Sequence, residues 1–470
     1  MSTQTRSTTA RMLRLGIGAF VLLLLGAGAI TSACGLLFGW QTLFARPTDA
    51  KEAATLTALA RQRLAQAQQI SAAENGYVPL QHDLTHWSTG ALFCVTSMAN
   101  YASKEDSKPQ DLSTATQVVL TFKRHALHEI EAAASRPAFV LPDSGANQSG
   151  TGRQSQILMK LDLIGKALFA YAEYCDAINK PARAVGPALA ELSLGEHLAH
   201  SGPLPVGLIG LGMERDACRV LARTVPMKSL PAGTVKRVLR ACLQVSADPR
   251  DLVTWTDETV ACTVDSLKQF HAGSGSLAPD MTPPAAGTLE TWLSRLTATH
   301  AAILVTNYYL QVRPFLARLD LDGVRATFAQ NFPVPQKTMA YQIAPMYANA
   351  LSRLLADRSQ VGATTIIAAL QSDYNDHSAF PASLSALVPR YVSKLPEDLA
   401  SPTRAYQYTL RGNSYRLLSS STLWSTGGHS STKQYYPLAT LPPLPPKLTI
   451  PEHGMGAVPG PLKPRPAVTK

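Results

Sequence analysis

The densest group of side chains that could bind a metal ion is His125, His128 and Glu129. On a helix these three residues fall at positions i, i+3 and i+4, so they share one face in a geometry that can hold a divalent cation. Their order departs from the HExxH and HxxEH zinc motifs, and Lys123 and Arg124 precede them. A solvated helical face is the simpler interpretation, a divalent-metal site is the alternative, and we expect no other cofactor.

Two pairs of carboxylates offer acid–base chemistry if both members of a pair share a cleft. The pairs are Asp257 with Glu258 and Glu214 with Asp216. Basic residues stand near them in the chain, at Arg215 and Lys268, so ion pairs or exposure to solvent are the simpler interpretation. The carboxylates alone therefore identify no reaction.

Asp320-Leu321-Asp322-Gly323 resembles the opening of a calcium-binding loop, with acids at its first and third positions. The twelfth position of such a loop needs a glutamate, and here it is Asn331. We therefore expect a helix end closed by Gly323 rather than a calcium site. Nucleophile elbows of the GxSxG type and Walker or Rossmann phosphate loops are also absent from the sequence.

The six cysteines include one with a specific alternative role. Cys34 follows Thr31-Ser32-Ala33, which is similar to a bacterial lipobox, although Thr31 replaces the usual Leu, Val or Ile and apolar residues follow. Acylation of Cys34 is therefore an alternative way of anchoring the chain. The other five, Cys94, Cys175, Cys218, Cys242 and Cys262, have neither zinc spacing nor a CxxC pair. We expect buried free thiols, with one or two disulfides as the alternative.

An apolar run at residues 15–38 decides where these groups would act. The run contains no charged residue and reaches the roughly 20 residues that span a bilayer as a helix. Arg6, Arg11 and Arg14 precede it and the first acid is Asp49, which places the N-terminus in the cytoplasm by the positive-inside rule. A cleaved signal peptide would have a shorter core, of about 7–15 residues. We therefore expect an uncleaved anchor in a bacterial inner membrane, with most of the chain in the periplasm.

The charge of the chain limits its partners. Lys and Arg outnumber Asp and Glu by 43 to 32, but they are scattered and form no basic-aromatic stripe. Nucleic acid is therefore not an expected partner. A solvated surface is the simpler interpretation, and attraction to anionic lipid or acidic wall polymers is the alternative. We expect the membrane as a partner through residues 15–38, envelope proteins are further candidates, and the sequence names no small molecule.

Helical periodicity dominates residues 47–360. Apolar residues recur at intervals of three and four, with Pro/Gly-rich turns between the segments. We expect helices at residues 51–75, 113–135, 157–178, 206–223, 234–245, 252–270 and 289–316. Residues 143–154 and 272–287 are expected internal junctions. These patterns predict an all-α body without a fixed-period repeat.

The pattern changes at residues 361–420. A helix at 364–374 precedes several proline-containing turns, and Tyr406, Tyr408 and Leu410 then alternate with polar residues. Gly412-Asn413 supplies a two-residue turn, and the alternation resumes at Tyr415. This arrangement predicts a β-hairpin.

Residues 363–419 resemble the globular part of the major pseudopilin of bacterial type II secretion systems, a block that also ends other membrane-anchored bacterial proteins. The similarity rests on a helix ending at Tyr374, Phe380-Pro381-Ala382-Ser383-Leu384, Leu387-Val388-Pro389, Tyr391, Leu395-Pro396, Asp398 and the tyrosine-rich hairpin. It implies a small α+β fold. Because the chain lacks the prepilin-peptidase signature and the pseudopilin calcium loop, the resemblance implies neither filament assembly nor calcium binding.

The chain is thus expected to be mainly α-helical, with a cytoplasmic tail and transmembrane anchor at 1–46, an extracytoplasmic body at 47–360 and the α+β module at 361–420. A Pro-rich disordered tail is expected at 421–470. The expected function is that of a non-enzymatic, single-pass envelope protein whose helical exterior binds or positions other envelope or secretion components. An extracytoplasmic hydrolase with a site between helices, metal-assisted at His125, His128 and Glu129, is the alternative.

Overall fold

The computed structural model describes residues 69–80, 127–140, 151–177, 180–200, 202–227, 230–245, 249–271, 289–332, 343–421 and 431–435, with single positions at 51, 54, 55, 58, 62 and 341. All belong to the larger of two compact units, Met1–Pro437. They are mainly helical with one small antiparallel sheet, which confirms the coarse fold class. Within these ranges no helix is long and apolar enough to cross a membrane. The expected anchor at 15–38, including Cys34, lies outside them.

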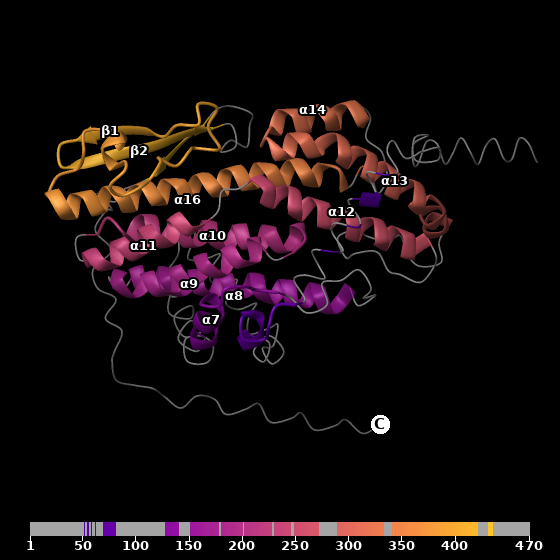
Figure 1. The fold of residues 1–470 in the computed structure, drawn as a ribbon, viewed down its shortest axis with the longest axis horizontal. Coiled ribbons are helices and arrows are strands. Elements are labelled where there is room, and N and C mark those ends of the chain that lie inside the picture. Colours follow the sequence, from indigo (N-terminus) through magenta and orange to yellow (C-terminus); the bar gives the residue numbers. More distant parts are fainter. Residues whose placement is uncertain are drawn as a thin grey trace, which may run out of the picture. The chain divides into compact units, whose positions relative to one another are not determined.

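Helix α16 (Pro345–His377) packs against elements of both helical groups described below and against the C-terminal module. Its 33 residues rise 1.5 Å each, so the helix is ~50 Å long. Every residue from 357 to 373 is buried, as expected for a helix covered on all sides. Figure 1 shows α16 between the sheet that carries β1 and β2 and the helices α10 and α11.

Four hydroxyls on the buried part of α16 are satisfied by the backbone of the helix. The hydroxyls of Ser359, Thr364, Thr365 and Ser372 each donate to the carbonyl four residues earlier, over 2.8–2.9 Å. Such bonds remove the cost of burying a hydroxyl among apolar neighbours. A central helix can therefore be polar in sequence and still lie inside the core.

Four helices make the first part of the body: α8 (Thr151–Ala177), α9 (Pro181–Ala199), α10 (Leu204–Thr224) and α11 (Ala232–Gln244). Helix α9 packs between α8 and α10, α7 (Leu127–Ala134) packs on α9, and both α10 and α11 pack on α16. The backbones of α9 and α10 nearly touch, because a Cβ atom at Gly195 would lie 2.8 Å from the carbonyl oxygen of Gly210. Glycine at these positions lets the two helices pack closely.

A second helical group packs on the N-terminal half of α16. It consists of α12 (Pro249–His271), α13 (Leu289–Ala317) and α14 (Leu321–Asn331). The core of this group is aromatic, and Trp255, Tyr308, Tyr309 and Tyr347 are fully buried in it. The rings of Tyr309 and Tyr347 lie 5.4 Å apart between centroids, within the range of favourable aromatic contact.

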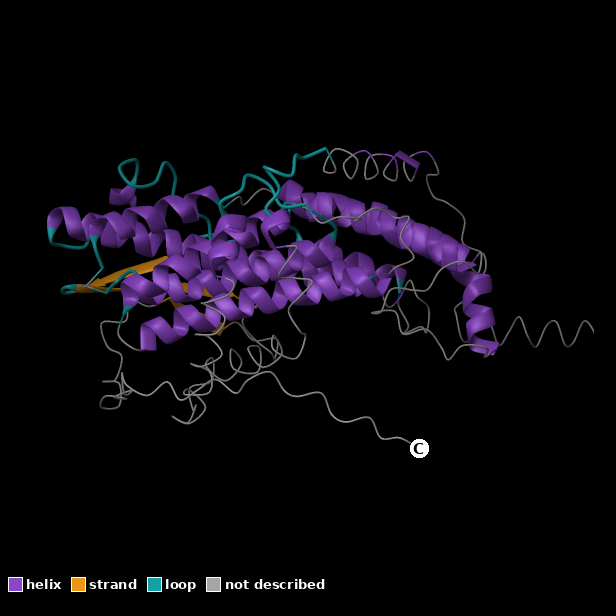
Figure 2. Ribbon diagram, turned by 90° about the horizontal axis from the view of Figure 1, so that it is seen from below, coloured by secondary structure: helices purple, strands orange, loops and turns teal. Residues whose placement is uncertain are grey.

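The strands β1 (Gln407–Arg411), β2 (Ser414–Ser421) and β3 (Ser431–Tyr435) form one antiparallel sheet in that order. Tyr408 pairs with Leu417 and Leu410 pairs with Tyr415. Gly412 supplies the turn with a φ of 56°, a value that glycine adopts without strain. The expected hairpin is confirmed, and a short 3-10 helix, η1 (Leu384–Leu387), precedes it. Figure 2 shows how small the sheet is beside the helices.

Several expected boundaries are wrong. Residues 151–154, expected in a junction, form the first turn of α8. The sequence pattern does not predict α9, because Pro187 and Gly195 interrupt its apolar periodicity. The boundary expected between residues 360 and 361 falls inside α16. No linker separates body and module there, and side chains from both sides of this point share one core.

Two further expectations need correction. Gly323 does not close a helix, because Asp320 caps the start of α14 and its carboxylate accepts a hydrogen bond of 2.9 Å from the N–H of Gly323. Aspartate favours this position since it satisfies a free N–H of the first turn. Residues 431–435, expected in the disordered tail at 421–470, pair with β2 as β3. The rest of that tail after residue 421 and the junction at 272–287 lie outside the described residues.

Candidate functional site

The proposed metal ligands are only partly described. His128 is exposed on α7 and Glu129 beside it is half-buried, whereas His125 lies outside the described residues. Across the described ranges, no group of three or more His, Cys, Asp or Glu side chains could hold a metal ion. The four described cysteines, Cys175, Cys218, Cys242 and Cys262, are not joined in disulfides, and all but Cys262 are buried.

The carboxylate of Asp257 is a buried structural group. Its side chain is fully buried, and Arg313 holds it with Nε at 2.9 Å from Oδ1 and Nη2 at 3.1 Å from Oδ2. The Tyr309 hydroxyl donates a third hydrogen bond of 2.5 Å. Burial, followed by the charge of Asp257, raises the pKa of Tyr309. The ion pair joins α12 to α13 and leaves Asp257 no free oxygen edge for substrate.

Glu214 and Asp216 have separate partners and do not form a catalytic pair. Asp216 pairs with Arg215 at 3.0 Å, as the sequence predicts. Glu214 is fully buried on α10, and its Oε2 accepts a hydrogen bond of 2.6 Å from Nη1 of Arg358 on α16. Burial raises the pKa of Glu214 to about 7, although the charge of Arg358 opposes the shift.

A pocket of about 660 Å³ lies beside the Arg358 side chain, and we call it the α16 pocket. Its walls come from the C-terminal end of α11, the turn after α13, the middle of α16 and residues 394–404 of the module. Its apolar lining consists of Leu243, Val245, Leu319, Val361, Leu395, Pro396 and Leu399. A pocket of this volume has the size of a small-molecule site.

The charged lining of the α16 pocket is mostly basic. Arg318, Arg358, Lys394 and Arg404 contribute four cations, and Glu397 is the single acid among the described lining residues. Glu397 is occupied by Lys394, whose Nζ lies 2.7 Å away, and the hydrogen bond and charge of Lys394 lower the pKa of Glu397. The remaining cations give the pocket a positive field.

Arg358, a lining residue of this pocket, has two donor atoms that are closed to solvent and have no acceptor among the described residues. The residue is 4% exposed, and only Nη1 of its guanidinium reaches Glu214. Its buried Nε and Nη2 have no acceptor among the described residues. Buried donors without partners are rare because each costs about 1–3 kcal/mol, and more when charged.

Two residues of the pocket wall have a strained backbone. Leu319 has a φ of 56° and Arg404 a φ of 54°. Ser378 is the one other non-glycine residue with positive φ among the described positions, and it does not line the pocket. For a residue with a bulky side chain this conformation costs roughly 1–2 kcal/mol. At Leu319 the conformation belongs to an ordinary C-terminal turn of α13, because its N–H donates to the carbonyl of Leu316 and the N–H of Asp320 donates to the carbonyl of Phe315.

The module wall is held against α16 at one close contact. A Cβ atom at Gly362 would lie 2.6 Å from the Tyr406 hydroxyl and 3.2 Å from Cβ of Pro396. The Tyr406 hydroxyl donates a hydrogen bond of 2.6 Å to the carbonyl of Ser359, and the Ser359 hydroxyl accepts one of 2.8 Å from the N–H of Ala400. Glycine at position 362 thus lets the module pack closely on α16.

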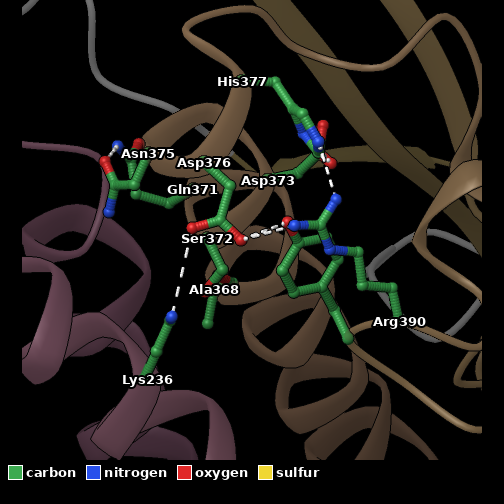
Figure 3. Close-up of polar contacts among 10 residues, drawn as sticks. Lys236, Ala368, Gln371, Ser372, Asp373, Asn375, Asp376, His377 and Arg390 are labelled. Atoms are coloured by element: carbon green, nitrogen blue, oxygen red, sulfur yellow. Dashed lines mark hydrogen bonds and ion pairs between the residues drawn. The ribbon is translucent and has the colours of Figure 1, made fainter.

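A second polar cluster fastens the end of α16 (Figure 3). Asp376 lies 3.3 Å from Nη2 of Arg390, accepts a 2.7 Å hydrogen bond from the Tyr391 hydroxyl, and lies 4.0 Å from Nζ of Lys236 on α11. The hydrogen bond from Tyr391, with the charges of Lys236 and Arg390, lowers the pKa of Asp376. The cluster therefore links α11, α16 and the module.

His377 in this cluster is held in a structural role. Its Nδ1 lies 2.8 Å from Oδ1 of Asp373, an arrangement that can orient a catalytic base. Its Nε2, however, lies 2.7 Å from Nη1 of Arg390. Arginine can only donate, so this contact makes Nε2 the acceptor and Nδ1–H the donor to Asp373. With Nε2 occupied, His377 cannot take a proton from a nucleophile in this arrangement.

Comparison with known proteins adds no relative to this picture. No protein-family model, curated protein or solved structure matches the chain. The geometry of the described residues must therefore carry the functional argument. It points to the α16 pocket, which the sequence patterns did not predict. In the sequence, the adjacent charged residues Asp357 and Arg358 are the signal that could have indicated this region. The structure buries every residue of the stretch that they begin.

Proposed function

We propose that the chain is a non-enzymatic binding protein of the bacterial envelope, anchored through residues 15–38, whose helical body binds or positions another molecule. The observation that carries the proposal is the α16 pocket. It has the volume of a small-molecule site, and its wall combines cations with apolar side chains. Such a lining can recognise a ligand without transforming it.

The lining favours binding over the alternative, a hydrolase. Hydrolysis through a protein nucleophile needs a base within hydrogen-bond reach of that nucleophile. Cys242, Thr365, Lys394 and Glu397 are the described lining residues with a nucleophilic atom, and no histidine is among the described lining residues. The Thr365 hydroxyl donates to the carbonyl of Val361, and Glu397 is paired with Lys394. The pocket therefore offers no activated nucleophile.

The C-terminal module has a place in this proposal. Its resemblance to the secretion pseudopilin supports an envelope setting, and residues 394–404 of the module supply one wall of the pocket. We propose that the module completes the binding site of the body and does not build filaments.

Site-specific photo-crosslinking in intact cells tests the function. A photoreactive residue at Leu243, which lines the pocket and is 47% exposed, should yield a crosslinked adduct in the membrane fraction. Met159, which is 41% exposed on α8 and outside the pocket lining, is the matched control. Adducts at Leu243 but not at Met159 support a binding protein that acts at the α16 pocket. Equal adducts at both positions, or none at either, would overturn the proposal, as would recovery of the chain in a soluble fraction.

A further inference from the structure

Two buried cysteines meet where α10 and α11 pack on α16. Cys218 on α10 is fully buried, Cys242 on α11 is 2% exposed, and both belong to the same apolar core. A hydrogen bond joins their side chains, so the two thiols are in direct contact. No disulfide joins them in the structure. The fold thus brings two reduced sulfur atoms from different helices to one place.

Helix α16 holds both cysteines at neighbouring positions. The Thr364 hydroxyl reaches the carbonyl oxygen of Cys218 at 3.3 Å, and the next residue, Thr365, lines the α16 pocket together with Cys242. Both α10 and α11 pack on α16. The contact between the thiols therefore follows from the packing of three helices and not from side chains that turn freely.

The completed fold closes both thiols to an oxidant. Cys218 and Cys242 expose at most 2% of their surface, and thiol–disulfide exchange needs a thiolate that can reach its target. The hydrogen bond with Cys242, together with burial, raises the pKa of the Cys218 thiol, so this group stays protonated in the core. Before α16 packs on α10 and α11, the faces that carry the two cysteines lack this cover. Oxidation of the pair therefore belongs to the folding stage.

We infer that Cys218 and Cys242 form a disulfide while the chain folds, and that this bond ties the pocket end of α11 to α10. The oxidant is itself a disulfide, carried in the cell by a thiol oxidase of the envelope. This inference rests on the periplasmic location in the proposed function, because disulfides form and persist in that compartment.

Two exchange steps balance the reaction. The thiolate of one cysteine attacks a sulfur of the oxidant, forms a mixed disulfide and expels one oxidant thiolate. The thiolate of the second cysteine then attacks the cysteine sulfur of the mixed disulfide and expels the other. Two electrons pass from the cysteines to the oxidant, and the two protons that the thiols lose end on the two oxidant thiols. The bond restricts the unfolded chain and should therefore stabilise the fold.

Oxidative refolding of the purified full chain tests the bond independently of its location in the cell. The chain is reduced and unfolded in urea and is then refolded with a mixture of reduced and oxidised glutathione. Remaining thiols are alkylated, and linked peptides are identified by mass spectrometry. We expect Cys218 to be linked to Cys242 in most chains. The folded, reduced chain in the same mixture should form the bond at least about tenfold more slowly, because the core closes both thiols.

Thermal unfolding with and without a reductant shows what the bond contributes. Reduction of the refolded wild type should lower its unfolding midpoint by roughly 5 °C or more. The double variant Cys218→Ala with Cys242→Ala should show no such shift, whereas Cys262→Ser should keep all of it. Cys262 is the matched control, because it lies on α12 and outside the core that contains the pair.

Three outcomes would overturn the inference: alkylation of both cysteines after refolding, a dominant link from either of them to another cysteine, or equal midpoints for the oxidised and reduced wild type. The peptide mapping uses the wild type, so it decides even where the double variant does not fold.

The same mapping on acid-quenched cells separates this inference from the proposed function. A link that forms in the purified chain but is absent from cells would reject the periplasmic setting, and with it the disulfide in the cell. A link that is present in cells without crosslinking at Leu243 would support the disulfide and reject the binding function alone.

Discussion

The buried pair of Glu214 and Arg358 makes the stability of the fold depend on pH. The folded state raises the pKa of Glu214 from 4.5 to about 7, chiefly through burial. Between these two values the folded chain binds more protons at Glu214 than the unfolded chain does. Stability from this group is therefore fully present below about pH 4.5 and is lost as the pH rises through 7. From pH 5 to pH 8 the loss amounts to about 2–3 kcal/mol.

Glu214→Gln removes this titration and should flatten the pH profile by that amount. The free energy of unfolding of the full chain, measured by urea titration at pH 5, 6, 7 and 8, should fall less steeply in the variant than in the wild type. Asp357, whose pKa burial raises from 3.8 to about 6, contributes a similar slope in both proteins and cancels in the comparison. Glu131→Gln is the control, because Glu131 is exposed on α7.

The comparison of slopes is decisive because it does not depend on the absolute stability of the variant. Gln at position 214 retains an oxygen acceptor for Arg358, so a uniform change in stability at every pH is compatible with the argument. Equal slopes in the wild type and in Glu214→Gln would show that the carboxylate titrates normally. The reasoning about the buried ion pair would then be refuted.

Three further predictions follow from the packing. Gly362→Ala should destabilise the fold by about 1–3 kcal/mol in urea titration, because the new Cβ would lie 2.6 Å from a buried tyrosine hydroxyl. Gly186→Ala is the control, because the space around this glycine is open, and it should be neutral or stabilising by up to ~1 kcal/mol. Tyr309→Phe should lower the free energy of unfolding by about 1.5–3 kcal/mol, because it removes a hydrogen bond to a buried carboxylate. Tyr308→Phe should be close to neutral, because its buried hydroxyl has no partner among the described residues. Similar losses of stability in both variants would contradict this prediction. The purified chain should carry no stoichiometric divalent metal by elemental analysis, and His128→Ala should leave the metal content unchanged; one bound metal per chain, lost in the variant, would contradict the solvated-face interpretation.

Local patterns predict much of the described fold. Apolar periodicity locates α10, α11, α12 and α13 to within a few residues of their observed ends, and alternation around Gly412 locates the first hairpin. Patterns fail where tertiary contacts override local preference. The N-terminal half of α16 carries charged residues that find partners on other helices, such as Arg358 with Glu214. Strand β3 exists because β2 offers it an edge.

The α16 pocket is beyond any local pattern. Its lining comes from four stretches of chain between Cys242 and Arg404. Side chains so far apart in sequence converge only when the whole fold is in place. The metal hypothesis at His125, His128 and Glu129 has the opposite weakness. A motif within one helix is visible in the sequence whether or not the fold brings further ligands to it.

The position of α16 in the chain also has a consequence for how the protein is made. The helix that the other elements cover comes after α8, α9, α10 and α11 in synthesis. Until residue 377 is available, the faces of α10 and α11 that pack on α16 have no partner. Most of the body therefore waits in an incomplete state for the last long helix, and its exposed apolar faces are prone to aggregation during that interval. A chaperone that holds the growing chain should matter more for this protein than for one whose central helix is made first.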